Sequence, residues 1–158
     1  QEDGTLQQGI QGYSTSANCD TLGFGVSAVS QLGNLYYHNS HDINSYQTAC
    51  RNQQLPPATG VLCTKKDQIH RAVIQALTCQ FEVNFSVIEQ CFAIDFASYF
   101  AAQWPQLLRM QSNGLLELSE QKLSITAPGR LYTLTVCQLF DDYLAQDTNQ
   151  TPSLVQMM

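Results

Sequence analysis

The chain has 158 residues, 44% of them hydrophobic, and a formal net charge of −6. This length suits one domain, since domains usually run ~100–200 residues. The seven Lys and Arg are scattered, and nucleic-acid affinity depends on clustered basic side chains, which argues against a phosphate-binding face. No stretch approaches the ~18 apolar residues of a membrane span and none resembles a signal peptide, so we expect neither nucleic acid nor membrane as a partner.

Six cysteines are spread along the sequence: Cys19, Cys50, Cys63, Cys79, Cys91 and Cys137. They are too sparse for a disulfide scaffold, and the last three lie in apolar helical patterns, where free cysteine is often buried. No pair has C-x-x-C spacing, which argues against a zinc ribbon or a thioredoxin-like site. We therefore expect a reduced, cytoplasmic protein.

The first strong element lies at residues 22–30, LGFGVSAVS, where bulky and small side chains alternate. This predicts a strand with one bulky face and one nearly bare face, and a bare face lets a backbone or ligand approach closely. No comparable strand signal lies nearby. We therefore expect this strand to pair with residues outside the chain, as in a larger sheet or barrel. Because the chain also begins at Gln1 and not at Met, we expect it to be a fragment.

A short helix and a linker are predicted next. Asp42 has the residue type of an N-cap for a helix over 42–50, with Ile43, Tyr46 and Cys50 on one face. Residues 51–62 contain two prolines and a glycine and therefore indicate a linker.

From residue 64 onward the apolar spacing is helical. Thr64 and Asp67 resemble a capping box at the start of a long helix, and a second helix is expected over 86–92. A third begins at Asp95, with a kink or restart at Pro105. The residues that we expect to form the core are Ile69, Val73, Leu77, Phe92, Phe100, Leu108, Leu134 and Phe140.

A hairpin and a final helix complete the pattern. The apolar pairs of LLELSEQKLSIT frame a short polar turn, which predicts a hairpin, and a helix follows from Thr126 to about residue 145. Three helices, a hairpin and a helix are the order of a winged-helix-like module. The residues alone therefore predict an α+β fold, mainly α, with a strand from a larger barrel followed by a helical domain with a wing.

The sequence offers only weak candidates for a dinucleotide, metal or catalytic site. Gly23 to Ala28 matches G-x-G-x-x-A, but a dinucleotide fingerprint needs its glycines between a strand and a helix, not inside a strand. His38 and His41 are best interpreted as solvated histidines, so we expect no metal site. His70 is expected at the surface or an edge, and Asp141-Asp142 on a solvated helix face. No catalytic residue is predicted in this chain.

Four stretches of sequence nevertheless carry a resemblance. They are QGYST, then LGFGVSAVSQLGNLYYHN, then IHRAVIQALTCQFEVNF, and finally NGLLEL with ITAPGRLYTLTVCQLFDDYL. In this order the chain resembles the oxygen-independent coproporphyrinogen III oxidases, which are radical S-adenosylmethionine (SAM) enzymes. The resemblance covers nearly the whole chain except its tail, and the order and spacing of the four motifs make it specific.

The resemblance implies a domain organisation. Residues 1–35 would be the C-terminal end of a partial TIM-like radical SAM barrel, and 36–63 a helix and linker. Residues 64–145 would form a helical, winged-helix-like C-terminal domain, and 146–158 a flexible tail. The chain would be the C-terminal portion of a monomeric enzyme.

The resemblance also implies an activity and its cofactors. The parent enzyme would convert two propionates of coproporphyrinogen III to vinyl groups in haem biosynthesis, using SAM and a [4Fe–4S] cluster. The family's C-x-x-x-C-x-x-C cluster motif is absent from these residues, so the chain itself supplies no cluster ligand. We expect this fragment alone to be inactive.

Three positions match SAM contacts of the family: Ile10, Gln11 and Val29. The family usually has Phe at the first and Ile at the last, so Ile10 lacks an aromatic surface and Val29 is a conservative change. Two other interpretations stay open. One is a non-catalytic winged-helix interaction module, and the other is a diverged paralogue that binds haem or SAM without turnover.

Overall fold

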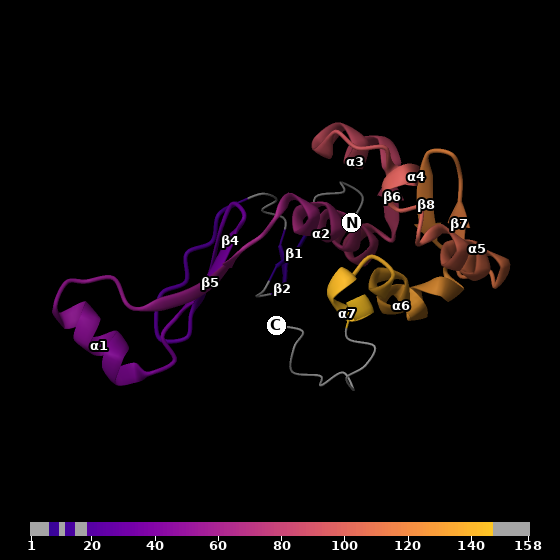
Figure 1. Ribbon diagram of the computed structural model, residues 1–158. Coiled ribbons are helices and arrows are strands. Elements are labelled where there is room, and N and C mark those ends of the chain that lie inside the picture. Colours follow the sequence, from indigo (N-terminus) through magenta and orange to yellow (C-terminus); the bar gives the residue numbers. More distant parts are fainter. Residues whose placement is uncertain (1–6, 10–11, 15–18, 147–158) are drawn as a thin grey trace. The chain divides into compact units, whose positions relative to one another are not determined.

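The computed structural model of the protein (Figure 1) describes residues 7–9, 12–14 and 19–146. The chain divides into two compact units, one of residues 16–68 and the other of residues 1–15 together with 69–158. Helices and strands occur in both, so the predicted mixture of α and β structure is confirmed. The strands of the described residues form small sheets of two or three strands and close no barrel.

The unit of residues 16–68 contains a three-stranded antiparallel sheet and one helix. Strands β3 (Val29–Leu32), β4 (Leu35–Asn39) and β5 (Ala58–Leu62) lie in that order, and β4 and β5 are labelled in Figure 1. Helix α1 (Ile43–Arg51) connects β4 to β5. The predicted linker over 51–62 is therefore wrong at its end, because residues 58–62 form an edge strand.

The predicted strand over 22–30 is wrong in its position and in its partner. It begins only at Val29, and it pairs within the chain, with Val29 opposite His38 and Leu32 opposite Leu35. The preceding residues bend and turn instead. The reason is local: Gly25 has a φ of +115° and Ser27 a φ of +59°, which an extended strand cannot accommodate.

Helix α1 begins where the sequence predicts. The Asp42 carboxylate accepts hydrogen bonds from the backbone N–H groups of Asn44 and Ser45, at 3.2 and 2.9 Å, which satisfies donors that have no partner inside the helix. These bonds, led by one from the Ser45 hydroxyl, lower the pKa of the Asp42 carboxyl. Ala49 is the buried residue of the helix, whereas Ile43 is exposed.

The other unit is helical with two small sheets. Its helices are α2 (Lys65–Gln80), whose first turn precedes the boundary between the units, α3 (Phe85–Phe92), α4 (Phe96–Tyr99), α5 (Trp104–Ser112), the 3₁₀ helix η1 (Pro128–Tyr132), α6 (Thr133–Gln138) and α7 (Asp142–Gln146). Its strands are β1 (Gln7–Gly9) with β2 (Gly12–Ser14), and β6 (Glu82–Asn84), β8 (Lys122–Ile125) and β7 (Leu116–Leu118) in that spatial order. The predicted hairpin is confirmed as β7 and β8, and β6 adds a strand that the sequence analysis missed.

Local signals set the boundaries of these helices. Thr64 and Asp67 form the predicted capping box, since each side chain accepts a hydrogen bond from the backbone N–H of the other. Pro105 lies in the first turn of α5, so the expected restart is confirmed. Proline fits there because the first helical N–H groups have no partner within the helix.

The core of this unit is apolar and aromatic. Its fully buried members include Val73, Leu77, Phe96, Phe100, Leu107, Leu123, Val136 and Phe140. Two predicted core residues are wrong: Leu108 is 48% exposed and Leu134 is 69% exposed. The final helix predicted from Thr126 to about residue 145 is in fact η1, α6 and α7. The three residues per turn of a 3₁₀ helix shift the phase of the residues after η1.

Two further expectations are corrected, because His70 is buried and Asp142, expected on a solvated helix face, is half-buried. The predicted surface histidine is only 8% exposed, and its Nδ1 donates a hydrogen bond of 2.6 Å to the carbonyl of Phe140. Its Nε2 lies 3.7 Å from a carboxylate oxygen of Asp142. A contact between residues 70 positions apart in sequence is not visible in local periodicity.

The described residues contain neither a disulfide nor a helix that could span a membrane. All six cysteines lie among the described residues and none forms a disulfide. None of the helices in the described part of the chain combines the length and apolarity needed to cross a lipid bilayer.

Candidate functional site

Of the predicted SAM-contacting residues, Val29 is the one that the structure describes. Ile10 and Gln11 lie outside the described residues. Val29 is the half-buried first residue of β3, and its partner on β4 is His38. In the strand predicted over 22–30, Val29 would lie near the C-terminal end, so its placement is corrected to the N-terminal end of β3.

The segment before Val29, residues 22–28, is named here the glycine loop. Its alternate residues Leu22, Phe24 and Val26 are 56%, 88% and 38% exposed. Between them, Gly23 and Gly25 direct their backbone groups to polar side chains of the same unit. The apolar side chains of the loop are therefore exposed, whereas the backbone of its glycines is held by hydrogen bonds.

Three side chains from different elements fix the loop. The Asn39 amide Nδ2 donates to the carbonyls of Gly23 and Gly25, at 3.3 and 2.8 Å. The Ser30 hydroxyl accepts from the N–H of Gly23, and the Tyr46 hydroxyl accepts from the N–H of Gly25, both at 3.0 Å. These bonds replace the sheet ladder that a strand would have used, so the loop has a defined conformation without being a strand.

The two glycines have different roles. A Cβ on Gly23 would collide with the carbonyl oxygen of Val29 and lie 2.9 Å from its carbon, so glycine permits the close approach of the loop to β3. The expectation that a bare face lets a backbone come close is confirmed at this position. A Cβ on Gly25 would meet no atom within 4 Å, so there is open space over this glycine, four residues before Val29.

A serine and two histidines lie beside the loop. The Ser27 hydroxyl and Nδ1 of His41 are hydrogen-bonded at 2.7 Å, and the His38 and His41 rings have centroids 4.6 Å apart. Nucleophilic catalysis also needs a group that orients the base, and His41 forms no further hydrogen bond among the described residues. Nowhere in the described ranges do three or more His, Cys, Asp or Glu come together as metal ligands.

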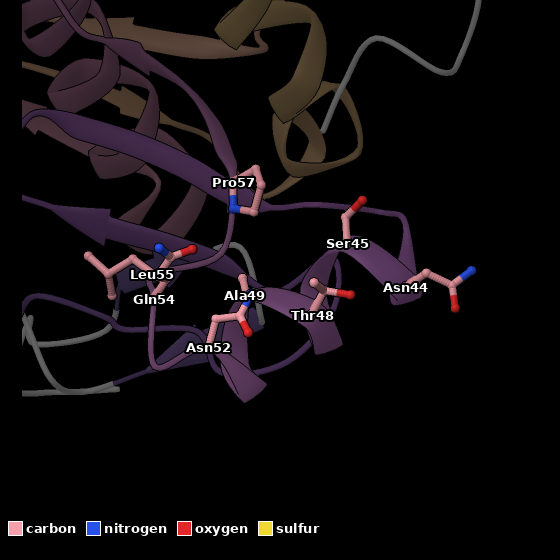
Figure 2. Close-up of a pocket in the computed structure, with 8 residues that line it drawn as sticks. All are labelled: Asn44, Ser45, Thr48, Ala49, Asn52, Gln54, Leu55 and Pro57. Atoms are coloured by element: carbon pink, nitrogen blue, oxygen red, sulfur yellow. The ribbon is translucent and has the colours of Figure 1, made fainter.

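A separate cavity of about 440 Å³ lies between α1 and the loop that follows it (Figure 2). Hydroxyl and amide side chains dominate its lining, and none of its lining residues is charged. It is lined by Asn44, Ser45, Thr48, Ala49, Asn52, Gln54, Leu55 and Pro57. No predicted site residue is among them, so the cavity is unrelated to the site proposed at Val29.

Comparison with known proteins identifies first a similar domain and then similar, longer proteins. Residues 63–132 match the model of the HemN C-terminal domain. The chain is 50% identical to an oxygen-independent coproporphyrinogen III oxidase of Pseudomonas aeruginosa, over 98% of this chain and 34% of that protein. It is 37% identical to the Salmonella typhimurium protein of the same name, over 92% of this chain and 32% of that one.

A solved structure agrees with these matches. The Escherichia coli coproporphyrinogen III oxidase (HemN), described as a radical SAM enzyme, superposes with a TM-score of 0.82 at 36% identity. The match covers 90% of this chain and 33% of that one. The chain thus spans about a third of the length of these relatives. The predicted resemblance is confirmed: this chain is related to the oxygen-independent coproporphyrinogen III oxidases and corresponds to their C-terminal portion.

The residues that fix the glycine loop were missed by the sequence analysis. Asn39 and Ser30 lie on neighbouring strands and Tyr46 on α1, so only the fold brings them together. One signal was available. Asn39 is a polar residue directly after LYYH, and a buried polar side chain at the end of an apolar strand must find a partner.

Proposed function

We propose that this chain is the C-terminal portion of an enzyme that converts two propionates of coproporphyrinogen III to vinyl groups by oxidative decarboxylation. The observation that carries the proposal is the 50% identity with the Pseudomonas aeruginosa oxidase, which extends over 98% of this chain. The substrate would be the tetrapyrrole, and SAM and a [4Fe–4S] cluster would be the cofactors. The cluster's ligands would come from residues outside this chain.

Within this chain we assign SAM contacts to Ile10, Gln11 and Val29. Val29 would offer its half-buried side chain as an apolar wall to the nucleoside or methionine part of SAM. The open space over Gly25 supports this assignment, because a ligand could approach there without displacing a side chain. Gln11 would hydrogen-bond to SAM, and Ile10 would add apolar contact. SAM and the cluster supply the one-electron chemistry; these residues bind and orient.

We also propose a domain architecture, an oligomeric state and a cellular location for the protein. Residues 1–35 would complete a partial barrel supplied mainly by other residues, and 64–145 would act as a winged-helix-like cover that keeps water from the substrate. We also propose a monomer in the cytoplasm. The family resemblance supports these assignments.

The test is made in the full-length protein under anaerobic conditions. Val29→Asp should abolish SAM cleavage, because a carboxylate would be placed against an apolar ligand surface, while Val29→Ile should leave cleavage near normal. Val61→Asp is the matched control, since Val61 lies on β5 and is 66% exposed. If Val29→Asp keeps normal cleavage and a normal thermal melt, the site is not at Val29. If the wild type binds SAM without decarboxylating the tetrapyrrole, the protein is a diverged paralogue.

A further inference from the structure

We infer that Asn39 is a positioning residue: its side-chain amide fixes the glycine loop and so holds Val29 where SAM is bound. The inference rests on the proposed function, because it assumes that Val29 contacts SAM. It adds a role for a residue to which no contact with SAM or substrate has been assigned.

Asn39 bonds to more of the loop than any other residue described. Its Nδ2 donates to the carbonyls of Gly23 and Gly25, and its backbone N–H donates to the carbonyl of Ala28 at 2.9 Å. One residue thus reaches three carbonyls of the loop. The last of them belongs to the residue directly before Val29.

The chemistry requires a carboxamide. Both loop carbonyls are acceptors, so the residue between them must present two N–H donors, and the Asn amide group does so without charge. The residue is 8% exposed, which makes the contacts strong and their loss costly. An aspartate has the same shape but would turn acceptor oxygens toward two carbonyls.

The loop has few other restraints on its conformation. Its N–H groups bond to Ser30, Tyr46 and the Ser40 carbonyl, the Ser27 hydroxyl bonds to His41, and one turn bond joins Ala28 to Gly25. With glycine at two positions, such a segment would otherwise sample many conformations. Fixing it before a ligand arrives removes an entropic cost from binding, which is the usual effect of preorganisation.

The experiment compares Asn39→Asp with Asn34→Asp in the full-length protein. Asn34 is an exposed asparagine directly before the start of β4, and its Nδ2 donates to the carbonyl of Cys63, so the control makes the same chemical change away from the loop. We expect Asn39→Asp to raise KM for SAM about tenfold with kcat changed by less than about threefold, the pattern of lost binding without lost chemistry. Asn34→Asp should leave both constants unchanged.

A second variant covers the case in which Asn39→Asp fails to fold. Tyr46→Phe removes only the hydroxyl that accepts from Gly25, so the packing of α1 is kept. It should raise KM for SAM in the same direction by a smaller factor. Amide hydrogen exchange of the full-length protein gives an independent measurement, and Gly23, Gly25 and Ala28 should exchange faster in both loop variants.

The outcomes separate the two proposals. If the wild type neither binds nor cleaves SAM, the proposed function fails and the role of Asn39 fails with it. If Val29→Asp abolishes cleavage but Asn39→Asp and Tyr46→Phe leave KM for SAM unchanged, the SAM site stands and the positioning role is overturned. A lower melting temperature with unchanged KM would give Asn39 a structural role alone.

Discussion

The carbonyl group of Val29 occupies the space that a side chain on Gly23 would need. The glycine N–H is meanwhile bonded to the Ser30 hydroxyl, so the loop is joined to β3 by one hydrogen bond and one close approach. The proposed SAM contact at Val29 therefore depends on the absence of a side chain at Gly23.

Gly23→Ala should destabilise the unit of residues 16–68 by about 1–3 kcal/mol, because the added methyl overpacks a site closed by backbone. Urea unfolding followed by amide exchange of this unit is the measurement. Gly33→Asn is the control: Gly33 has a φ of +55° and open space around it, and asparagine tolerates that conformation. Equal stability of Gly23→Ala and wild type would mean that the loop moves away at no cost.

Leu77→Ala should lower the free energy of unfolding by about 2–5 kcal/mol, the usual range for a buried leucine. Leu77 is fully buried in the core of the helical unit, whereas Leu134 of α6 is 69% exposed. Leu134→Ala is therefore the matched control and should change stability by less than about 0.5 kcal/mol. Denaturant unfolding monitored by helical circular dichroism measures both, and similar losses would contradict the assignment of the core.

Sequence periodicity predicted the helices best where one helix runs unbroken. Ile69, Val73 and Leu77 recur on one face of α2, and all three are buried. The prediction failed at Leu108 and Leu134, which come after the restart at Pro105 and the 3₁₀ turn at Pro128. Each break changes the residues per turn or starts a new helix, so the phase of the pattern beyond it cannot be carried forward.

The candidate site was predictable in composition but not in geometry. The glycines of LGFGVSAVS correctly indicated a backbone approached closely, and Gly23 shows this approach. The alternating pattern nevertheless predicted a strand, because alternation does not reveal that Gly25 and Ser27 have positive φ. The contacts of Asn39 with the loop join residues 14 and 16 positions apart, and local pattern carries no information about them.

Glu82 should make the stability of the sheet of β6, β8 and β7 depend on pH. A hydrogen bond from Lys122, on the neighbouring strand, is the main cause that lowers the pKa of the Glu82 carboxyl below its ordinary 4.5, and the Ser124 hydroxyl adds to it. A lowered pKa in the folded state means that the stabilisation is present above 4.5 and is lost as the pH falls through the folded value.

The comparison of Glu82→Gln with wild type tests this. The wild type should be more stable at neutral pH, and the difference should shrink as the pH falls below 4.5. Glu117→Gln, which removes a carboxylate of β7 opposite Ser124, is the matched control for the loss of a carboxylate from the same sheet. A difference between Glu82→Gln and wild type that stays constant with pH would contradict a role for the ionised carboxylate.

His70, on α2, contacts the segment between α6 and α7. Replacing His70 tests how much this contact contributes to stability. Nδ1 donates to the Phe140 carbonyl at 2.6 Å, and the ring lies edge-on to Phe100, with centroids 5.2 Å apart. His70→Phe keeps a ring of similar width but removes the donor, which leaves a carbonyl in the core without this bond. The expected loss is about 1–3 kcal/mol in the free energy of unfolding, the cost of an unsatisfied buried group.

His70→Gln separates the hydrogen bond from the packing of the ring. Its amide N–H can replace the Nδ1 donor, so it should recover part of the loss seen in His70→Phe. Amide exchange should show the same order at Asp141 to Leu144, which come after the accepting carbonyl and include the start of α7. If His70→Phe is as stable as wild type and exchange in this segment is unchanged, the hydrogen bond contributes nothing and α7 is held by its other contacts.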